Sequence, residues 1–422
     1  MTAANKIEIA VIGGGIGGLC VAIGLLKYKH LNVNIYEAAS KFSEIGAGVG
    51  LGPNSQRAMA AIDPKIYEAF IAQATNNGWE SHRHTWFQFR DGTEGHGEEL
   101  LTAPKNQTGQ TTLHRALFLD ELVKLVPKEI AHFGKRVVQI VDNGENGVTL
   151  HFKDNTTVIA DAVIGADGIH SPTRAFLLGA DHPATKPQFT HTVAYRGLIP
   201  MDEAREAIGS EFAENAIMWI GKGKSVMTYP ISFGKIVNIV AIEAPVESWD
   251  HAELVIPVER GALEKLFSGL SKTPASVISL LEKTNVNAWS MWDMLENAPY
   301  YNKGNVCMMG DGAHATTPYQ GQGAGQATED ALVLESLLGR VTDVKQIAAA
   351  FKAYDQVRRP RTQKVVATSR EAGEILTQIH PSFGEDLKKI KQEVETRMSW
   401  MWDADMNEHV QDAVKAMEVF LA

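Results

Sequence analysis

A glycine-rich loop directly follows the first apolar segment and has the spacing of a dinucleotide-binding motif. Residues 13–18 read GGGIGG, so Gly13, Gly15 and Gly18 occupy the glycine positions of GxGxxG. In that motif the first glycine permits a tight turn, the second lets the backbone approach a pyrophosphate, and the third lets a helix pack closely on a strand. Glu37 follows where a carboxylate can accept hydrogen bonds from ribose hydroxyls. The pattern predicts dinucleotide binding but does not distinguish FAD from NAD(P).

The segments around this loop predict the βαβ unit that would position it. Residues 7–12 read IEIAVI, an apolar run typical of a central parallel strand, 19–28 predict a helix, and 33–36 predict a second strand. Residues 7–26 are nearly free of charge and about long enough to span a membrane. Their six glycines and Glu8 favour a strand, a turn and a buried helix instead, so no membrane span is expected.

Two further segments make the first motif more specific. Residues 165–171 read GADGIHS, and 310–314 read GDGAH, running on to PYQGQGAG at 318–325. Together the three motifs resemble the FAD-dependent aromatic hydroxylases, the class A flavoprotein monooxygenases of the para-hydroxybenzoate hydroxylase fold. The resemblance runs from about Lys6 to at least Arg361.

The resemblance implies which residues bind the cofactor. Asp311 would bind the ribityl chain, Asp167 would support FAD and nicotinamide binding, and Arg115 would lie near the ribityl and pyrophosphate groups. Backbone N–H groups at the start of a helix would stabilise negative charge on the reduced flavin. The residues expected there are Gly323, Ala324 and Gly325.

Finer features narrow the branch of the family. Residues 44–54 read EIGAGVGLGPN and look like the salicylate hydroxylase group, in which the EIGAG stretch, ending here at Gly48, lies along the flavin. The sequence Trp400-Met401-Trp402 is also similar to that group. Tyr319 is a departure, because many salicylate hydroxylases carry His at this position, and it leaves the assignment of salicylate itself open.

Two polar residues on predicted strands are the catalytic candidates. Arg196 and Tyr229 resemble an Arg/Tyr pair in fungal phenol-hydroxylating and dearomatising relatives. Arg196 would clamp a substrate carboxylate or phenolate, and Tyr229 would hydrogen-bond the phenolic oxygen and favour its ionised form. A surface Arg and a sheet-packing Tyr are the alternatives. The candidate walls of the substrate pocket are Trp86, Trp219, Met227, Pro318 and Tyr319.

The strand pattern changes between residues 191 and 244, where long alternating segments follow one another and no helix separates the last three. This predicts an antiparallel sheet and a second domain. We therefore expect an α/β fold: a Rossmann-type FAD-binding domain, an inserted antiparallel-sheet substrate domain and a C-terminal helical segment. The predicted ranges are 1–80, 105–175 and 295–365 for the FAD-binding domain, 81–104 and 176–294 for the substrate domain, and 366–422 for the helical segment.

Composition excludes several other classes. Forty Lys and Arg against 50 Asp and Glu give a net charge of −10 without a basic run, so nucleic acid is not an expected partner. Cys20 and Cys307 are the two cysteines, too few for a disulfide framework, and the first residues lack a signal-peptide pattern. A cytoplasmic monomer or homodimer is expected. No HExxH or GxSxG motif occurs, so neither a metal site nor a hydrolase is expected.

The resemblance also implies a reaction. NADH or NADPH would reduce FAD, O₂ would then give a C4a-hydroperoxyflavin, and a phenol or phenolic acid would be hydroxylated, with loss of CO₂ if the attacked carbon bears a carboxylate, as in the conversion of salicylate to catechol. A dearomatising hydroxylase or epoxidase on a larger substrate, and an FAD-binding regulatory protein without turnover, are the alternatives. The exact substrate, the choice of NADH or NADPH and the occurrence of decarboxylation stay open.

Overall fold

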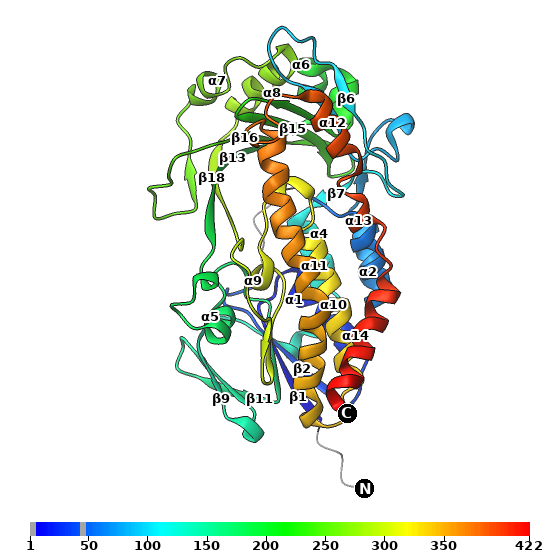
Figure 1. Cartoon of the computed structure of the whole chain (residues 1–422), viewed down its shortest axis with the longest axis vertical. Helices are drawn as coiled ribbons and strands as arrows, with labels where there is room; N and C mark the ends of the chain where they lie inside the picture. Colours follow the sequence, from blue (N-terminus) through cyan, green and yellow to red (C-terminus); the bar gives the residue numbers. More distant parts are fainter. Residues whose placement is uncertain (1–5, 43–47) are drawn as a thin grey trace.

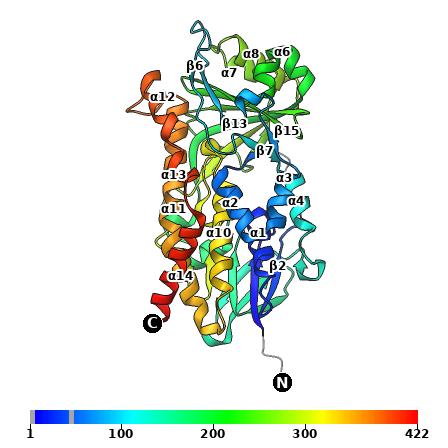
Figure 2. The same cartoon turned by 90° about the vertical axis from the view of Figure 1, so that its right-hand side faces the viewer.

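The computed structural model describes residues 6–42 and 48–422. Two sheets lie towards opposite ends of an elongated molecule, and the long helix α11 (Ile347–Leu376) runs between them (Figure 1). The helices that follow α11 continue along one side of the molecule (Figure 2). These are α12 (Leu387–Thr396), α13 (Ser399–Trp402) and α14 (Met406–Leu421).

The first sheet is the Rossmann-type core and has the strand order β19-β20-β12-β1-β2-β8. Its strands are parallel except β19. Helix α1 (Ile16–Leu25) is buried on nearly every residue because it lies between this sheet and the helices α2 (Pro53–Ile62) and α10 (Gly323–Leu338). The strands are β1 (Ile7–Ile12), β2 (Leu31–Tyr36), β8 (Ala131–His132), β12 (Ala162–Gly165), β19 (Asn302–Lys303) and β20 (Val306–Met308).

The second sheet has eight strands in the order β17-β18-β13-β16-β15-β14-β5-β6. It is antiparallel, as the strand pattern of residues 191–244 predicts, except that β14 pairs with β5 in parallel. Strand β5 comes from a separate stretch of the chain, so no hairpin turn forces the two strands to run in opposite directions. The strands are β5 (Gln88–Asp91), β6 (Leu100–Thr102), β13 (Gln188–Pro200), β14 (Ile217–Gly221), β15 (Lys224–Ile231), β16 (Ile236–Glu243), β17 (Val255–Pro257) and β18 (Asn287–Asp293).

All eight strands fall within the ranges 81–104 and 176–294, and the division of the chain into domains at those boundaries remains a prediction. Two small three-stranded sheets complete the β structure: β3 (Gly48–Gly50), β7 (Thr111–His114) and β4 (Thr75–Asn76), and β9 (Val137–Asp142), β10 (Val148–Phe152) and β11 (Thr157–Ala160). The other helices are α3 (Pro64–Ile71), α4 (Arg115–Val123), α5 (Pro172–Leu178), α6 (Met201–Glu214), α7 (Ala262–Leu266), α8 (Lys272–Glu282) and α9 (Asp311–His314).

A buried ionic network joins α10 to α11. The Arg358 guanidinium donates to Glu329 Oε2 at 2.5 Å and to Asp330 Oδ1 at 2.8 Å, and all three side chains are fully buried. Burial alone would raise the pKa of Asp330, but the neighbouring His314 and Arg358 lower it to about 2. His314 Nε2 lies 2.5 Å from Asp330 Oδ2, which also accepts from the backbone N–H of Gly310 at 3.0 Å. The network therefore fixes the segment 310–314 as well as the two helices.

The same network reaches the C-terminal helices. Arg361 donates to both oxygens of Glu329 and to the carbonyl of Met401 at 3.2 Å, and Arg57 on α2 donates to the carbonyl of Trp402. His409 Nε2 lies 3.0 Å from Arg358 Nη1. The position of α13 is thus set by two cations: Arg57 of α2, and Arg361 of α11, which Glu329 of α10 holds in place.

Among the described residues, no helix is long and apolar enough to cross a membrane.

Removal of the central cation should destabilise the fold strongly. Arg358→Met leaves two buried carboxylates without their main partner, and breaking a buried ion pair from one side costs about 3–5 kcal/mol. Chemical denaturation should show the corresponding fall in the free energy of unfolding. The matched control is Arg205→Met, which breaks exposed ion pairs on α6 and should change the unfolding midpoint little. Equal effects of the two substitutions would contradict the central role of Arg358.

Candidate active site

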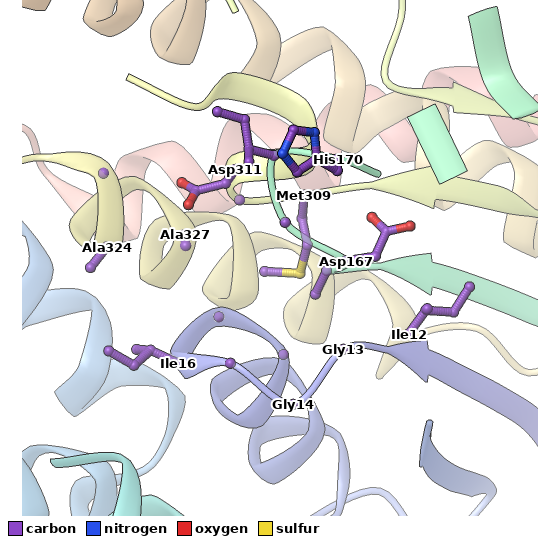
Figure 3. A pocket seen from close by; sticks show the side chains of 18 of the residues that line it. Ile12, Gly13, Gly14, Ile16, Asp167, His170, Met309, Asp311, Ala324 and Ala327 are labelled. Carbon is purple, nitrogen blue, oxygen red and sulfur yellow. The ribbon is translucent and has the colours of Figure 1, made fainter. Parts of the chain in front are cut away.

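A large cavity of about 800 Å³ lies at the carboxyl ends of the parallel strands, where α1 and α10 begin (Figure 3). Cavities of this size at this edge of an α/β sheet are the usual place for a ligand. It is lined by the whole glycine loop 13–18 and by most of the residues predicted to bind a cofactor. These are Gly13, Gly15, Gly18, Glu37, Gly48, Arg115, Asp167, Asp311, Gly323 and Ala324.

The glycine loop cannot carry side chains at two of its positions. Gly13 has φ +102°, and a Cβ added there would lie 2.3 Å from the carbonyl oxygen of Ala166. A Cβ on Gly18 would lie 2.1 Å from the carbonyl oxygen of Gly13. The turn and the close packing of α1 on the loop therefore both require glycine, as the motif predicts.

Two helix N-termini face the large cavity. Helix α1 begins after Gly15 and α10 begins after Gln322, and no side chain of a described residue caps either helix. Their free N–H groups and the helix dipoles favour an anionic ligand. Gly323 and Ala324 line the cavity, but Gly325 packs against α2 instead, where an added Cβ would lie 2.1 Å from Ser55 Oγ. Glycine at 325 allows α2 and α10 to pack closely, and the contact of its N–H group with the cofactor remains a prediction.

The two predicted acids have different surroundings, and both lie at the large cavity (Figure 3). Asp311 is exposed to it at the start of α9. The carboxylate of Asp167 accepts from Ser171 Oγ at 2.5 Å and from the N–H and hydroxyl of Thr173 at 2.9 and 2.6 Å. Burial raises the pKa of Asp167, and these hydrogen bonds oppose the rise. Asp311 is thus open to a ligand hydroxyl, whereas Asp167 holds its own loop in shape.

The acid Glu37 lies against the glycine loop, with basic side chains near it. Glu37 accepts from the backbone N–H groups of Gly14 and Ala39, each at 2.7 Å. Lys135 and Arg136 line the cavity beside it and were not predicted, because the strand pattern around them carries no motif.

These features fit FAD. The N–H groups of α1 and the nearby basic side chains suit a pyrophosphate, Asp311 and Glu37 suit sugar hydroxyls, and the N-terminus of α10 suits a flavin ring that gains negative charge. The EIGAG residues 44–47, predicted to lie along the flavin, fall outside the described residues.

A smaller aromatic cavity of about 120 Å³ adjoins the large one. Arg196, Gly48 and Pro318 line both cavities. The strand pairing brings three wall residues together. Arg196 on β13 lies beside Val240 on β16, and Val240 lies beside Met227 on β15. Of the predicted site residues, those that line the aromatic cavity are Gly48, Trp86, Arg196, Met227, Tyr229, Pro318 and Tyr319.

Trp219 does not line the aromatic cavity, which corrects the prediction. Successive residues of a strand point to opposite faces of a sheet, so Met218 faces the cavity and Trp219 faces away from it. Trp219 is fully buried on the other face, where it packs against Phe212 of α6. The alternating pattern was present in the sequence, but the sequence alone did not say which face was the functional one.

Arg196 is a cation without an ionic partner in the described part of the chain. Its guanidinium lies over the ring of Trp289, 5.4 Å from the ring centroid, and its Nε is buried with no hydrogen-bond partner. Burial lowers the pKa of Arg196, Tyr229 opposes this shift, and the positive charge of Arg115 adds to it. A ligand anion at the junction of the two cavities would supply the missing charge.

Tyr229 lies against the backbone of β3. Its hydroxyl donates to the carbonyl of Gly48 at 3.1 Å, and a Cβ on Gly48 would lie 2.7 Å from its ring. Burial raises the pKa of Tyr229 to about 12, although Arg196 opposes the rise, so the hydroxyl is protonated at neutral pH. Asn238 faces Tyr229 across the sheet and accepts from the N–H of Gly48 at 3.2 Å.

Several residues of the aromatic cavity were not predicted, among them Asn238 and Trp402. The amide Nδ2 of Asn238 is buried there without a described partner, and no motif marks this residue. Trp402 closes the cavity from the C-terminal segment, with its ring centroid 5.3 Å from that of Trp86. The Trp400-Met401-Trp402 resemblance was the signal that could have placed Trp402 here.

Residues 6–369 match the family model described as an FAD binding domain. The chain is 50% identical to the 6-methylsalicylate 1-monooxygenase atA of Aspergillus terreus over 98% of this chain and 93% of that one. It is 36% identical to the salicylate hydroxylase of Pseudomonas putida, over 96% and 94% of the two chains. A solved salicylate hydroxylase substrate complex superposes with a TM-score of 0.87 at 34% identity, covering 97% of this chain and 98% of that one.

These comparisons confirm the predicted fold class, the FAD cofactor and the enzyme class, with phenolic hydroxylation as the type of reaction. The chain therefore belongs to the class A FAD-dependent monooxygenases, in the salicylate hydroxylase-like group.

Proposed function

We propose that the enzyme hydroxylates a salicylate at the ring carbon that bears the carboxylate, with 6-methylsalicylate or a closely related alkylsalicylate as its substrate. The relative at 50% identity bears the name 6-methylsalicylate 1-monooxygenase, and two others, one known from sequence and one from structure, bear the name salicylate hydroxylase. In a salicylate, carbon 1 carries the carboxylate. Attack at that carbon couples hydroxylation to loss of CO₂.

The observation that carries the proposal is the unpaired guanidinium of Arg196 at an aromatic cavity. Arg196 is half-buried, and a partly buried charge is costly unless an opposite charge accompanies it. An aromatic acid supplies both the missing anion and a ring for the apolar walls, and a guanidinium binds a carboxylate or phenolate through two parallel hydrogen bonds. The aromatic cavity of about 120 Å³ suits a single ring, since a cavity of about 150 Å³ binds benzene.

In the proposed reaction, 6-methylsalicylic acid, NAD(P)H, one proton and O₂ give 3-methylcatechol, NAD(P)⁺, CO₂ and water. A new C–O bond forms at carbon 1, the bond from carbon 1 to the carboxyl carbon breaks, and its electron pair restores the aromatic ring. Bound FAD supplies the hydride acceptance and the activation of O₂.

The residues of this chain position and polarise the substrate. Arg196 would stabilise the substrate anion and favour the ionised phenol, which pushes electron density towards the attacked carbon. Tyr229 donates its hydroxyl proton to the carbonyl of Gly48, so in place of the predicted donation to an ionised phenol it would present its lone pairs to a protonated group of the substrate. Trp86, with Trp402 against it, excludes water from the ring.

The alternative reactions are less well supported. A dearomatising or epoxidising enzyme for a larger substrate would need more room than the aromatic cavity provides. A regulatory FAD protein without turnover would not need an unpaired cation beside an aromatic cavity. The choice of NADH or NADPH stays open, and the assembly as a monomer or homodimer and the cytoplasmic location remain predictions.

The direct test measures turnover by the purified holoenzyme with NADH and with NADPH. O₂ uptake, CO₂ release and the aromatic product are followed together for salicylate, 6-methylsalicylate, 3-hydroxybenzoate and phenol. We expect one CO₂ and one catechol per O₂ with 6-methylsalicylate, and no CO₂ with phenol. Hydroxylation of the salicylates with the carboxylate retained would contradict the proposal.

Arg196→Met should lower the catalytic efficiency without destabilising the fold. Loss of hydrogen bonds to an anion costs about 1.5–3 kcal/mol, so kcat/KM for 6-methylsalicylate should fall by roughly 10- to 200-fold. FAD content should be unchanged. The unfolding midpoint should stay the same or rise, because the variant lacks an unpaired cation. A large loss of stability with unchanged kinetics would instead assign Arg196 a structural role.

A further inference from the structure

A third, rear cavity of about 10 Å³ lies behind the aromatic cavity. Trp86, Tyr319 and Gln320 line both, so these side chains form the partition between them. The far wall comes from α11 and the C-terminal helical segment and is apolar apart from Arg397. The side chains that form it include Ile375, Leu376, Val394 and Met398.

The ring of Tyr319 occupies the place that a side chain of α11 would fill. A Cβ added to Gly373 would lie 2.4 Å from Cε2 and 2.9 Å from Cζ of Tyr319, far closer than van der Waals contact. Gly373 is itself buried in the helix. Glycine at 373 therefore lets the Tyr319 ring lie back against α11, away from the centre of the aromatic cavity.

The dimensions of the two cavities limit the substrate. The aromatic cavity suits one ring without an alkyl group, and at about 10 Å³ the rear cavity is too small to hold a group of its own while the partition stays in place. A salicylate ring with an alkyl substituent therefore needs a shift of the partition that joins the two spaces. Of the three partition residues, Tyr319 is the one whose ring occupies space that is free because residue 373 is glycine.

We propose that Tyr319, lying on Gly373, determines how large an alkyl substituent the substrate ring can carry. The substituent enters the rear cavity past the Tyr319 ring and packs against α11 and the C-terminal segment. This inference rests on the proposed function, because it assumes that a salicylate ring occupies the aromatic cavity. It gives the C-terminal segment a role in substrate selection.

Two variants of opposite effect test it in the holoenzyme. Gly373→Ala pushes the Tyr319 ring towards the cavities, and should lower the ratio of kcat/KM for 6-methylsalicylate to that for salicylate by at least tenfold, since one methyl group in an apolar pocket is worth 10- to 200-fold. Tyr319→Ala opens the partition and should raise the ratio for 6-propylsalicylate to 6-methylsalicylate by at least tenfold. Glu374→Ala, on the next residue of α11, is the matched control and should leave both ratios unchanged.

Equilibrium binding of the same salicylates, followed by tryptophan fluorescence, separates the two proposals. Turnover with CO₂ release, but with both ratios of kcat/KM unchanged in the two variants, would overturn this inference and leave the proposed function intact. Binding without CO₂ release would overturn the proposed function, and the order of affinities in the variants would still decide the inference. Failure of the wild type to bind any salicylate would overturn both. FAD content and circular dichroism identify a variant that fails to fold, in which case the other variant decides.

Discussion

The buried pairing of Arg358 with Glu329 and Asp330 is the constraint on which the site depends. Two carboxylates on α10 have no access to water, so they are stable as anions only while the cations of α11 lie against them. Through Asp330 the pairing fixes the segment that presents Asp311 to the large cavity. Through Arg361 and Glu329 it also fixes the C-terminal turn that carries Trp402. One set of charges thus aligns the N-terminus of α10, the carboxylate of Asp311 and the Trp402 ring that closes the aromatic cavity.

Arg358 and Arg196 differ in the charges that surround them. Arg358 is surrounded by acids and stabilises the fold, whereas Arg196 has no ionic partner in the described ranges, 6–42 and 48–422, and lies between two cavities. A protein of net charge −10 has a field that repels small anions, so an anionic substrate needs a local cation of this kind. The same position between the cavities brings the substrate anion next to the place where the cofactor would bind. Recognition of the substrate and polarisation of its ring therefore fall to one side chain.

The sequence predicted the parts of this account that depend on local geometry. The turn at Gly13 and the close packing at Gly18 follow from spacing and neighbouring elements, and the structure shows the steric reason for both. Predictions that depended on which face of an element is functional were less secure. Trp219 and Gly325 are one residue away from positions that do line cavities, because a shift of one residue reverses the face of a strand or rotates a helix by 100°. Trp402 and Gly373 act through contacts with segments distant in the sequence, which no local pattern reveals.

The most direct measurement of the central claim is a crystal structure of the holoenzyme with 6-methylsalicylate bound under anaerobic conditions. The account predicts that the ring lies in the aromatic cavity between Trp86 and Met227, with a carboxylate or phenolate oxygen within hydrogen-bonding distance of the Arg196 guanidinium. It also predicts that the methyl group points towards Tyr319. A ligand bound outside this cavity, or an Arg196 side chain that turns away from the ligand to pair with a carboxylate of the protein, would contradict it.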